Sequence, residues 1–454
     1  ALMEVMAKGD FYFTINDVPP SIELKEDGWP ESHYKALLES GWLDGEKAPM
    51  VLEGNQLSWR RWYTETDEIV NNLLFRSKSR SRFSIRGSNN SLPLLTLEGN
   101  EEQNAAIDAV TKESVILLSG GPGTGKTTTI AKILERAISY SPGIKIALAA
   151  PTGKAARRMQ DALQIETFKP LRVRQDLEKK RFSCVTLHKL LLAGSGGFGR
   201  NKQNPLNLDL LVVDEMSMVD LSLMHALLEA LPEECQLVLV GDSNQLPPVG
   251  SCAIWHQLQE SDLRKQFGDG AIHLHRLYRN RGGLASLSTV LRDQGLDSFW
   301  KELSSLSTNE NVELHQYPIN KIPNFLVKLL KPHLQKLESL CEGTLEKIAE
   351  DLHTSSPIEP DLEALLDLLF NRLDQLMVLC PRRRGLLGVN YVNKILLGKA
   401  FEEGITSWPE GTPVMCGENQ PEFDLANGDI GLVLGKGVNR RLLFRVISSE
   451  GDTV

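Results

Sequence analysis

The stretch GGPGTGKT, residues 120–127, decides the fold class of this chain of 454 residues. It fits the pattern G-x-x-x-x-G-K-[ST], follows the apolar run 115–118 and precedes a helical stretch, 128–137. In such a strand–loop–helix unit, backbone N–H groups at the start of the helix surround phosphate groups. The sequence therefore predicts an α/β P-loop NTPase with a parallel sheet; the alternative is a chance glycine-rich turn.

Each part of this loop has an expected role in binding ATP and Mg²⁺. Lys126 is expected to reach the β- and γ-phosphates, and the hydroxyl of Thr127 to bind Mg²⁺. The loop as a whole is expected to enclose the phosphates. We assign to ATP binding Gly121, Pro122, Gly123, Thr124, Gly125, Lys126, Thr127 and Thr128.

Two acidic residues follow another apolar run, 210–213. At the end of a buried strand, Asp214 is placed to hold Mg²⁺, and Glu215 to act as the general base that activates water. The alternative is a pair of acids that simply ends an amphipathic strand. A third run, 237–240, leads to Gln245, an uncharged amide that can sense the γ-phosphate.

The pattern between residues 101 and 281 alternates short apolar runs with helical stretches, which is typical of βαβ units. The segment 283–375 is expected to be mainly helical. A strand-like run follows at 376–379, and the chain is β-rich after Thr412.

The amino-terminal region carries no visible chemistry. Residues 32–38 and 65–74 predict amphipathic helices, and residues 50–52 with 56–59 predict a hairpin. Residues 76–90 carry five basic side chains and no acidic one. This last segment is either a solvated linker or a stretch that contacts phosphate.

Composition excludes several classes of protein. With 41% hydrophobic and 24% charged residues the chain is globular, and its net charge of −9 excludes a protein-wide attraction to polyanions. The six cysteines form no C-x-x-C pair, which argues against zinc or redox motifs and for a reducing, cytosolic compartment. No run approaches the ~18 apolar residues of a membrane helix.

Five motifs in order resemble a known family. They are GGPGTGKTTT (120–129), APTGKAARRM (150–159), TLHKLL (186–191), VVDEMSM (212–218) and VGDSNQLPPVG (240–250). The set is similar to superfamily 1 helicases of the 5′→3′ branch and, within them, to the RecD family, the alpha subunits of bacterial exodeoxyribonuclease V (RecBCD). The resemblance implies two RecA-like motor domains that use ATP and Mg²⁺, a 5′-ended single DNA strand as substrate, RecB-like and RecC-like partners, and a role in DNA repair and recombination.

The resemblance also assigns roles to further residues by position. Gln103 matches an amide that reads adenine, the alternative being a surface glutamine. Arg279 matches an arginine that reaches the γ-phosphate, the alternative being a surface arginine. The residues that match DNA-backbone contacts are Pro151, Thr152, Gly153, Lys154, Thr186 and His188. For His188, a core or capping role is the alternative.

The family pattern divides the chain into three parts. Residues 1–90 would form an amino-terminal partner-docking domain with the basic linker, although Trp59 and Trp62 could equally be its own core. Residues 91–282 would form the first RecA-like ATPase domain, and 283–454 the second, with an SH3-like insert beginning at about residue 411. The family continues after this insert with a T-x-H-K-[ST]-Q-G segment and a Tyr/Thr-Arg motif. Neither is found in this sequence, so we expect an incomplete second motor domain.

We therefore expect an ATP-hydrolysing 5′→3′ DNA helicase of a RecBCD-like complex. One alternative is a stand-alone RecD-like helicase. Another is a module that binds nucleotide and single-stranded DNA, or docks to other subunits, with little turnover. A P-loop kinase or GTPase is disfavoured by Gln245, by the APTGKAA loop and by the lack of an N-K-x-D motif.

Overall fold

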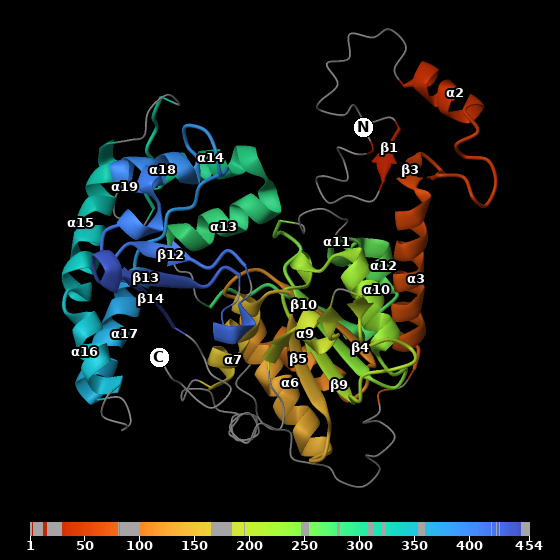
Figure 1. Ribbon diagram of the computed structural model, residues 1–454. Coiled ribbons are helices and arrows are strands. Elements are labelled where there is room, and N and C mark those ends of the chain that lie inside the picture. Colours follow the sequence, from red (N-terminus) through yellow and green to blue (C-terminus); the bar gives the residue numbers. More distant parts are fainter. Residues whose placement is uncertain are drawn as a thin grey trace. The chain divides into compact units, whose positions relative to one another are not determined.

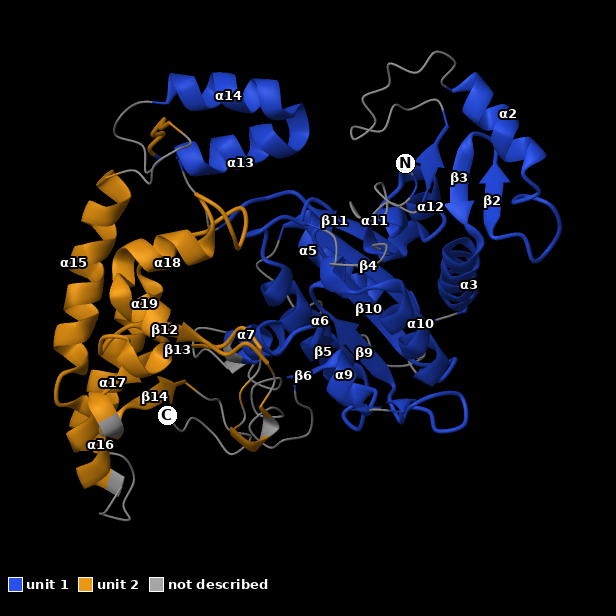
Figure 2. Cartoon of the chain, turned by 45° about the horizontal axis from the view of Figure 1, so that its top comes forward, with its two compact units in different colours: residues 1–312 blue, residues 313–454 orange. Residues whose placement is uncertain are grey.

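The structure is a computed structural model that describes residues 2, 12–15, 30–79, 81, 100–164, 184–194, 196–246, 254–278, 282–306, 312–318, 324–352, 359–418, 420–423, 425 and 427–445. The chain forms two compact units, residues 1–312 and 313–454 (Figure 2). Helices α13 (Gly283–Gln294) and α14 (Leu296–Ser305) therefore belong to the first unit. The division into three functional domains stays a prediction.

A six-stranded sheet forms the centre of unit 1 (Figure 1). Its strand order is β11-β4-β10-β9-β5-β6, and every neighbouring pair is parallel. The strands are β4 (Val115–Gly120), β5 (Ile146–Ala150), β6 (Cys184–Thr186), β9 (Leu210–Val213), β10 (Gln236–Gly241) and β11 (Ala271–Leu274). The predicted parallel sheet and its apolar runs are thus confirmed.

Both faces of this sheet are covered, because successive side chains of a strand point to opposite faces. Leu117 of β4 belongs to one buried cluster, while its neighbours Ile116 and Leu118 belong to the other. The cluster of Ile116 includes residues of α5 (Glu101–Ala109), α6 (Lys126–Tyr140) and α7 (Gly153–Gln164). The cluster of Leu117 includes residues of α3 (Arg60–Ser77), α10 (Leu221–Ala230) and α11 (Ile254–Leu258).

The amino-terminal region forms a small antiparallel sheet and two helices, as its patterns predict. The sheet has the order β1-β3-β2, with β1 (Phe13–Thr14), β2 (Met50–Glu53) and β3 (Gln56–Trp59). Helix α2 spans Glu31–Glu39, and α3 follows the hairpin directly. Trp59 and Trp62 are half-buried, pack against the core cluster and meet edge to face at 6.5 Å. This packing favours a core role for both residues, in a cluster that also includes residues of the central sheet.

The beginning of the predicted basic linker is helical. Arg76 lies in the last turn of α3 and is 4% exposed. Its guanidinium donates to the carbonyls of Pro232 at 2.7 Å and Leu231 at 2.9 Å. The linker interpretation is therefore wrong for Arg76, because these carbonyls hold its charge inside the protein. Residues 80 and 82–90 lie outside the described part of the chain.

The remaining elements of unit 1 are short. They are α9 (Leu187–Leu190), β7 (Ala193–Gly194), β8 (Gly197–Phe198), η1 (Met216–Met218), α12 (Ser261–Lys265) and η2 (Gly268–Gly270).

Unit 2 is helical, with a three-stranded antiparallel sheet of order β12-β13-β14. Its helices are α15 (Asn324–Cys341), α16 (Thr344–Leu352), α17 (Pro360–Asp374), α18 (Val389–Leu397), α19 (Lys399–Glu403), η3 (Ile405–Ser407), η4 (Pro421–Phe423) and η5 (Gly437–Asn439). Its strands are β12 (Pro413–Met415), β13 (Ile430–Leu434) and β14 (Arg441–Phe444).

The prediction of a strand at residues 376–379 is wrong. This run is irregular, and Met377 is 58% and Leu379 86% exposed. A strand requires a neighbour for its backbone N–H and C=O groups, and no described strand pairs with this run. The described residues of unit 2 accordingly contain no parallel sheet.

Three further absences concern only the described residues. Helices long and apolar enough to cross a membrane are not found among them. Their five cysteines, Cys184, Cys235, Cys341, Cys380 and Cys416, form no disulfide with one another. No group of three or more His, Cys, Asp or Glu side chains there is arranged to hold a metal ion.

Candidate nucleotide-binding site

The loop between β4 and α6 is folded tightly around its glycines. Gly123 and Gly125 have φ angles of +78° and +86°, a left-handed conformation that other residues adopt only with strain. The buried hydroxyl of Thr124 donates to the carbonyl of Gly121 at 2.9 Å. A Cβ atom at Gly120 would approach the Thr124 hydroxyl to 2.7 Å. The G-x-x-x-x-G spacing is therefore required by the turn itself.

Lys126 is the first residue of α6, and its side chain turns back over the loop. Its ammonium donates to the carbonyls of Gly120 at 2.6 Å and Gly121 at 3.0 Å. Thr127 and Thr128 are half-buried in the first helical turn, where backbone N–H groups favour an anion. The loop thus brings the ammonium of Lys126 and the first turn of α6 to the same side of the predicted phosphate site.

Asp214 follows β9 and is bound in place by backbone hydrogen bonds. Its N–H donates to the carbonyl of Ala149 at 2.9 Å, and its Oδ1 accepts the N–H of Glu215 at 2.8 Å. Burial raises the pKa of Asp214 from 3.8 to about 6, while the Glu215 N–H and the charge of Lys126 oppose the rise. A carboxylate that is costly to ionise when unpaired is well suited to a cation.

Glu215 has an unusual backbone and an unpaired oxygen. Its φ of +54° and ψ of 45° are left-handed, a conformation that costs a residue with a Cβ roughly 1–3 kcal/mol. Its Oε2 is buried without a hydrogen-bond partner in the described part of the chain. Strain of this kind concentrates at functional sites, where the surrounding structure maintains it.

Gln245 lies in the loop after β10 and is held beside the acidic pair. The hydroxyl of Ser217, which is fully buried, donates to its Oε1 at 3.2 Å. The sequence motif DEMSM contains Ser217, but the pattern alone did not single it out. The serine orients the amide so that its NH₂ group remains available.

Gln103 and Tyr278 both lie against the phosphate loop. Gln103 is 4% exposed, so the alternative of a surface glutamine is wrong. A Cβ atom at Gly125 would lie 2.7 Å from Gln103 Nε2 and 3.7 Å from the ring of Tyr278. The N–H of Tyr278 also donates to the carbonyl of Gly123 at 2.8 Å. The expected γ-phosphate residue Arg279 lies just outside the described residues.

The two segments expected to contact DNA lie at neighbouring strand ends. β5 and β6 are parallel, with Ala150 opposite Thr186. Thr152 Oγ1 accepts the N–H of Ala155 at 3.2 Å at the start of α7, and Thr186 Oγ1 accepts that of Lys189 at 3.2 Å. Each hydroxyl retains its own proton for a phosphate oxygen.

The other expected DNA contacts are accessible. Pro151, Gly153 and Lys154 are partly exposed, and His188 is exposed. The alternative of a core histidine at position 188 is therefore wrong, because its ring is exposed; it lies 6.2 Å from the ring of Phe198. Thr186, rather than His188, caps α9.

Apart from Gln103, whose helix α5 precedes β4, these segments follow parallel strands, whose carboxyl ends meet at one edge of a sheet. Lys126 follows β4, Asp214 follows β9, and Gln245 follows β10. The structure therefore brings the predicted nucleotide residues to one edge of the sheet. Their catalytic roles stay predictions.

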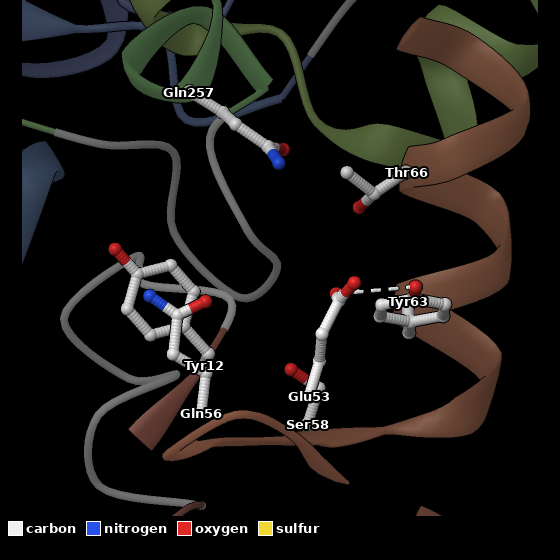
Figure 3. Close-up of a pocket in the computed structure, with 7 residues that line it drawn as sticks. All are labelled: Tyr12, Glu53, Gln56, Ser58, Tyr63, Thr66 and Gln257. Carbon is white, nitrogen blue, oxygen red and sulfur yellow. Dashed lines mark hydrogen bonds between the residues drawn. The ribbon is translucent and has the colours of Figure 1, made fainter. Parts of the chain in front are cut away.

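A small cavity of about 50 Å³ lies elsewhere, in the amino-terminal region (Figure 3). Polar side chains line it, and the hydroxyl of Tyr63 donates to Glu53 at 3.2 Å. Its lining residues are Tyr12, Glu53, Gln56, Ser58, Tyr63, Thr66 and Gln257. None of the expected site residues is among them, so the cavity is separate from the nucleotide site.

Comparisons with known proteins agree with this arrangement. Residues 103–251 match the family described as AAA domain. The RecBCD enzyme subunit RecD of Mycolicibacterium smegmatis is 31% identical over 445 residues, which cover 94% of this chain and 73% of that protein. The same subunit of Mycobacterium tuberculosis is 31% identical over 440 residues, covering 93% and 71%. The ATP-dependent RecD2 DNA helicase of Deinococcus radiodurans is 40% identical over 150 residues, covering 33% and 18%.

Proposed function

This chain belongs to the RecD family of RecBCD enzyme subunits, and we propose that it is an ATP-dependent 5′→3′ DNA helicase acting in a RecBCD-like complex. One observation carries the proposal. Lys126, Asp214 and Gln245 follow three parallel strands of one sheet and meet at its carboxyl edge, where P-loop motors bind and hydrolyse nucleotide.

ATP would bind with its phosphates in the loop 120–127. The ammonium of Lys126 would exchange the carbonyls of Gly120 and Gly121 for phosphate oxygens. Gln103, buried against Gly125, is positioned to hydrogen-bond the base, with Tyr278 beside it. These contacts would fix both ends of the nucleotide.

The acidic pair fits Mg²⁺ that arrives with ATP. Thr127 and Asp214 would hold the ion, which favours hydroxyl and carboxylate oxygens. The unpartnered buried Oε2 of Glu215 supports a site completed by bound water and nucleotide. When bound, Mg²⁺ neutralises charge on the β- and γ-phosphates.

Hydrolysis would be carried out by residues of the same edge. Glu215 would take the proton of the attacking water, and Lys126 would stabilise the charge that develops on the phosphate. Gln245, oriented by Ser217, would report whether the γ-phosphate is present. Arg279 would add a second positive charge.

Single-stranded DNA would lie along the ends of β5 and β6. Thr152 and Thr186 begin helices there, and their hydroxyls and Lys154 suit phosphate rather than base recognition. The neighbouring strands β9 and β10 carry the acidic pair and Gln245. A change at the nucleotide can therefore reach the DNA contacts through rigid strands.

RecB-like and RecC-like subunits would be the partners, and the amino-terminal region would contribute to docking. A stand-alone RecD-like helicase is the second candidate. The observation that favours it is the 40% identity between 150 residues of this chain and the RecD2 helicase. Co-purification with the presumed RecC-like subunit distinguishes the two, since only the first candidate predicts a stable complex.

The test is ATP hydrolysis and unwinding with the full chain, alone and with its partner subunits. We expect single-stranded DNA to stimulate hydrolysis, and duplexes with a 5′ overhang to be unwound in preference to those with a 3′ overhang. Lys126→Gln should abolish both activities, while Lys202→Gln, on the exposed surface, should retain them. Full activity of the Lys126 variant would overturn the proposal.

A further inference from the structure

Helix α13 brings an arginine to the phosphate loop that no motif predicts. Arg292 lies near the end of this helix, and its side chain is 16% exposed. A Cβ atom at Gly121 would lie only 3.2 Å from Arg292 Nη1. The guanidinium therefore covers the backbone of the loop, although 171 positions separate the two residues, Gly121 and Arg292.

The guanidinium is only partly used. Nε donates to Asp293 Oδ1 at 2.8 Å, and Nη2 donates to Asp293 Oδ2 at 3.3 Å. Nη1, the nitrogen at Gly121, has no hydrogen-bond acceptor among the described residues. Asp293 is half exposed. The ion pair is therefore accessible to solvent, and another anion can replace Asp293 at low cost.

Two cations meet at the same glycine. The ammonium of Lys126 donates to the carbonyl of Gly121 at 3.0 Å, and Arg292 Nη1 lies 3.2 Å from the place that a Cβ of that residue would take. Asp242, which follows β10 and is 3% exposed, is close enough to act on Arg292. The hydrogen bond to Asp293, with the charges of Asp293 and Asp242, raises the pKa of Arg292 and keeps it cationic.

We infer that Arg292 binds the terminal phosphate of ATP by leaving Asp293. The inference rests on the proposed function, because it concerns the same nucleotide. Lys126 marks the part of the loop where the β- and γ-phosphates bind, and Arg292 converges on that part. A guanidinium that holds a carboxylate through two nitrogens can hold a phosphate with the same geometry.

Replacement of Asp293 by the terminal phosphate as the partner of Arg292 would make the contact between α13 and the phosphate loop depend on the bound nucleotide. With ADP, Asp293 keeps the arginine. With ATP, the phosphate replaces Asp293, and the last turn of α13 is bound to the phosphate loop. A purely structural Arg292 would instead support the loop equally in both states, so its removal would weaken ATP and ADP alike.

The experiment compares the dissociation constants of ADP and of a non-hydrolysable ATP analogue, both with Mg²⁺, for the full chain. For Arg292→Ala we expect the dissociation constant of the ATP analogue to rise roughly 10-fold or more, and that of ADP to change by about 2-fold or less. Arg292→Lys keeps the charge without the fork and should fall between. Asp293→Asn removes the competing carboxylate. It should lower the dissociation constant of the ATP analogue and leave that of ADP unchanged.

Matched controls lie far from the loop. Arg61→Ala removes an exposed arginine that pairs with Glu65 on its own helix, and Asp297→Asn changes an exposed acid of α14; neither should alter nucleotide binding. Equal losses of ADP and ATP analogue in Arg292→Ala, or no loss, would overturn the inference while wild-type binding still supports the proposed function. Absence of nucleotide binding by the wild type would overturn both.

Discussion

The buried hydroxyl of Ser217 donates a hydrogen bond to Oε1 of Gln245 at 3.2 Å. The bond links the 3-10 turn after the acidic pair to the loop after β10. It also fixes which end of the amide is free, since the oxygen is occupied and the NH₂ group can donate. Gln245, the proposed γ-phosphate sensor, is thereby oriented by a residue from the neighbouring strand's loop.

Ser217→Ala should lower kcat more than it raises the KM for ATP. One neutral hydrogen bond corresponds to about a 2- to 10-fold effect, and the bond orients a group rather than holding the nucleotide. Steady-state ATP hydrolysis in the presence of single-stranded DNA measures both constants. Ser217→Thr, which keeps a hydroxyl, should recover part of kcat; a rise in KM alone would contradict this role.

The left-handed backbone of Glu215 predicts opposite effects on activity and stability. Glu215→Gly should lose about 100-fold or more of the rate of ATP hydrolysis, because the proposed general base is gone. Glycine adopts φ near +54° without strain, so this variant should be more stable than Glu215→Ala by roughly 1 kcal/mol. Urea unfolding of the two variants measures the difference, and equal stability would show that the strain is absent.

Asp214 predicts a pH-dependent cost to stability. The folded protein holds its proton more tightly, with a pKa of about 6 against 3.8 for the unfolded chain. Ionisation of Asp214 therefore lowers the free energy of unfolding as the pH rises from 3.8 to about 6, and the full loss is present above pH 6. Asp214→Asn should stabilise the nucleotide-free protein at pH 7.5 by about 1–3 kcal/mol, and by less at pH 5.

Denaturant unfolding of wild type and Asp214→Asn at the two pH values gives this comparison. Asparagine keeps an Oδ1 that can accept the N–H of Glu215, so the change isolates the charge. Excess Mg²⁺ and ATP should stabilise the wild type more than the variant. A stability difference that is the same at pH 5 and pH 7.5 would contradict the raised pKa.

Local patterns predicted the phosphate loop and the strands of the parallel sheet because their signals are short. Four glycines and a lysine at fixed spacing define the loop, and fully apolar runs define strands buried on both faces. The run 376–379 has the same apolar character, yet it is irregular. Strand formation depends on a partner, which the run itself does not encode.

The residues that sequence reasoning missed act through distant contacts. Arg292 reaches Gly121 from a helix that begins more than 160 residues later. Ser217 bonds to a residue 28 positions away, and the burial of Gln103 depends on how α5 packs on the phosphate loop. A single sequence carries no pattern for such pairs, because Arg292 and Ser217 by themselves look like ordinary polar surface residues.

The hydrogen bonds of Arg76 predict that α3 contributes to the stability of the motor domain. Its guanidinium donates to the carbonyls of Leu231 and Pro232, and burial lowers its pKa. Arg76→Met should lower the free energy of unfolding by about 2–4 kcal/mol, because two carbonyls lose their donors. Arg61→Met, at an exposed surface pair, should change it by less than about 0.5 kcal/mol.

Denaturant unfolding of the full chain, followed by tryptophan fluorescence and by the loss of bound nucleotide, tests this coupling. Ile69 and Leu73 of α3 share a buried cluster with Leu237 and Leu239 of β10, the strand beside the phosphate-loop strand β4. The Arg76→Met transition should therefore shift to lower denaturant for both signals together. If only the tryptophan signal shifted, α3 would be an independent appendage, and its role in the motor would be excluded.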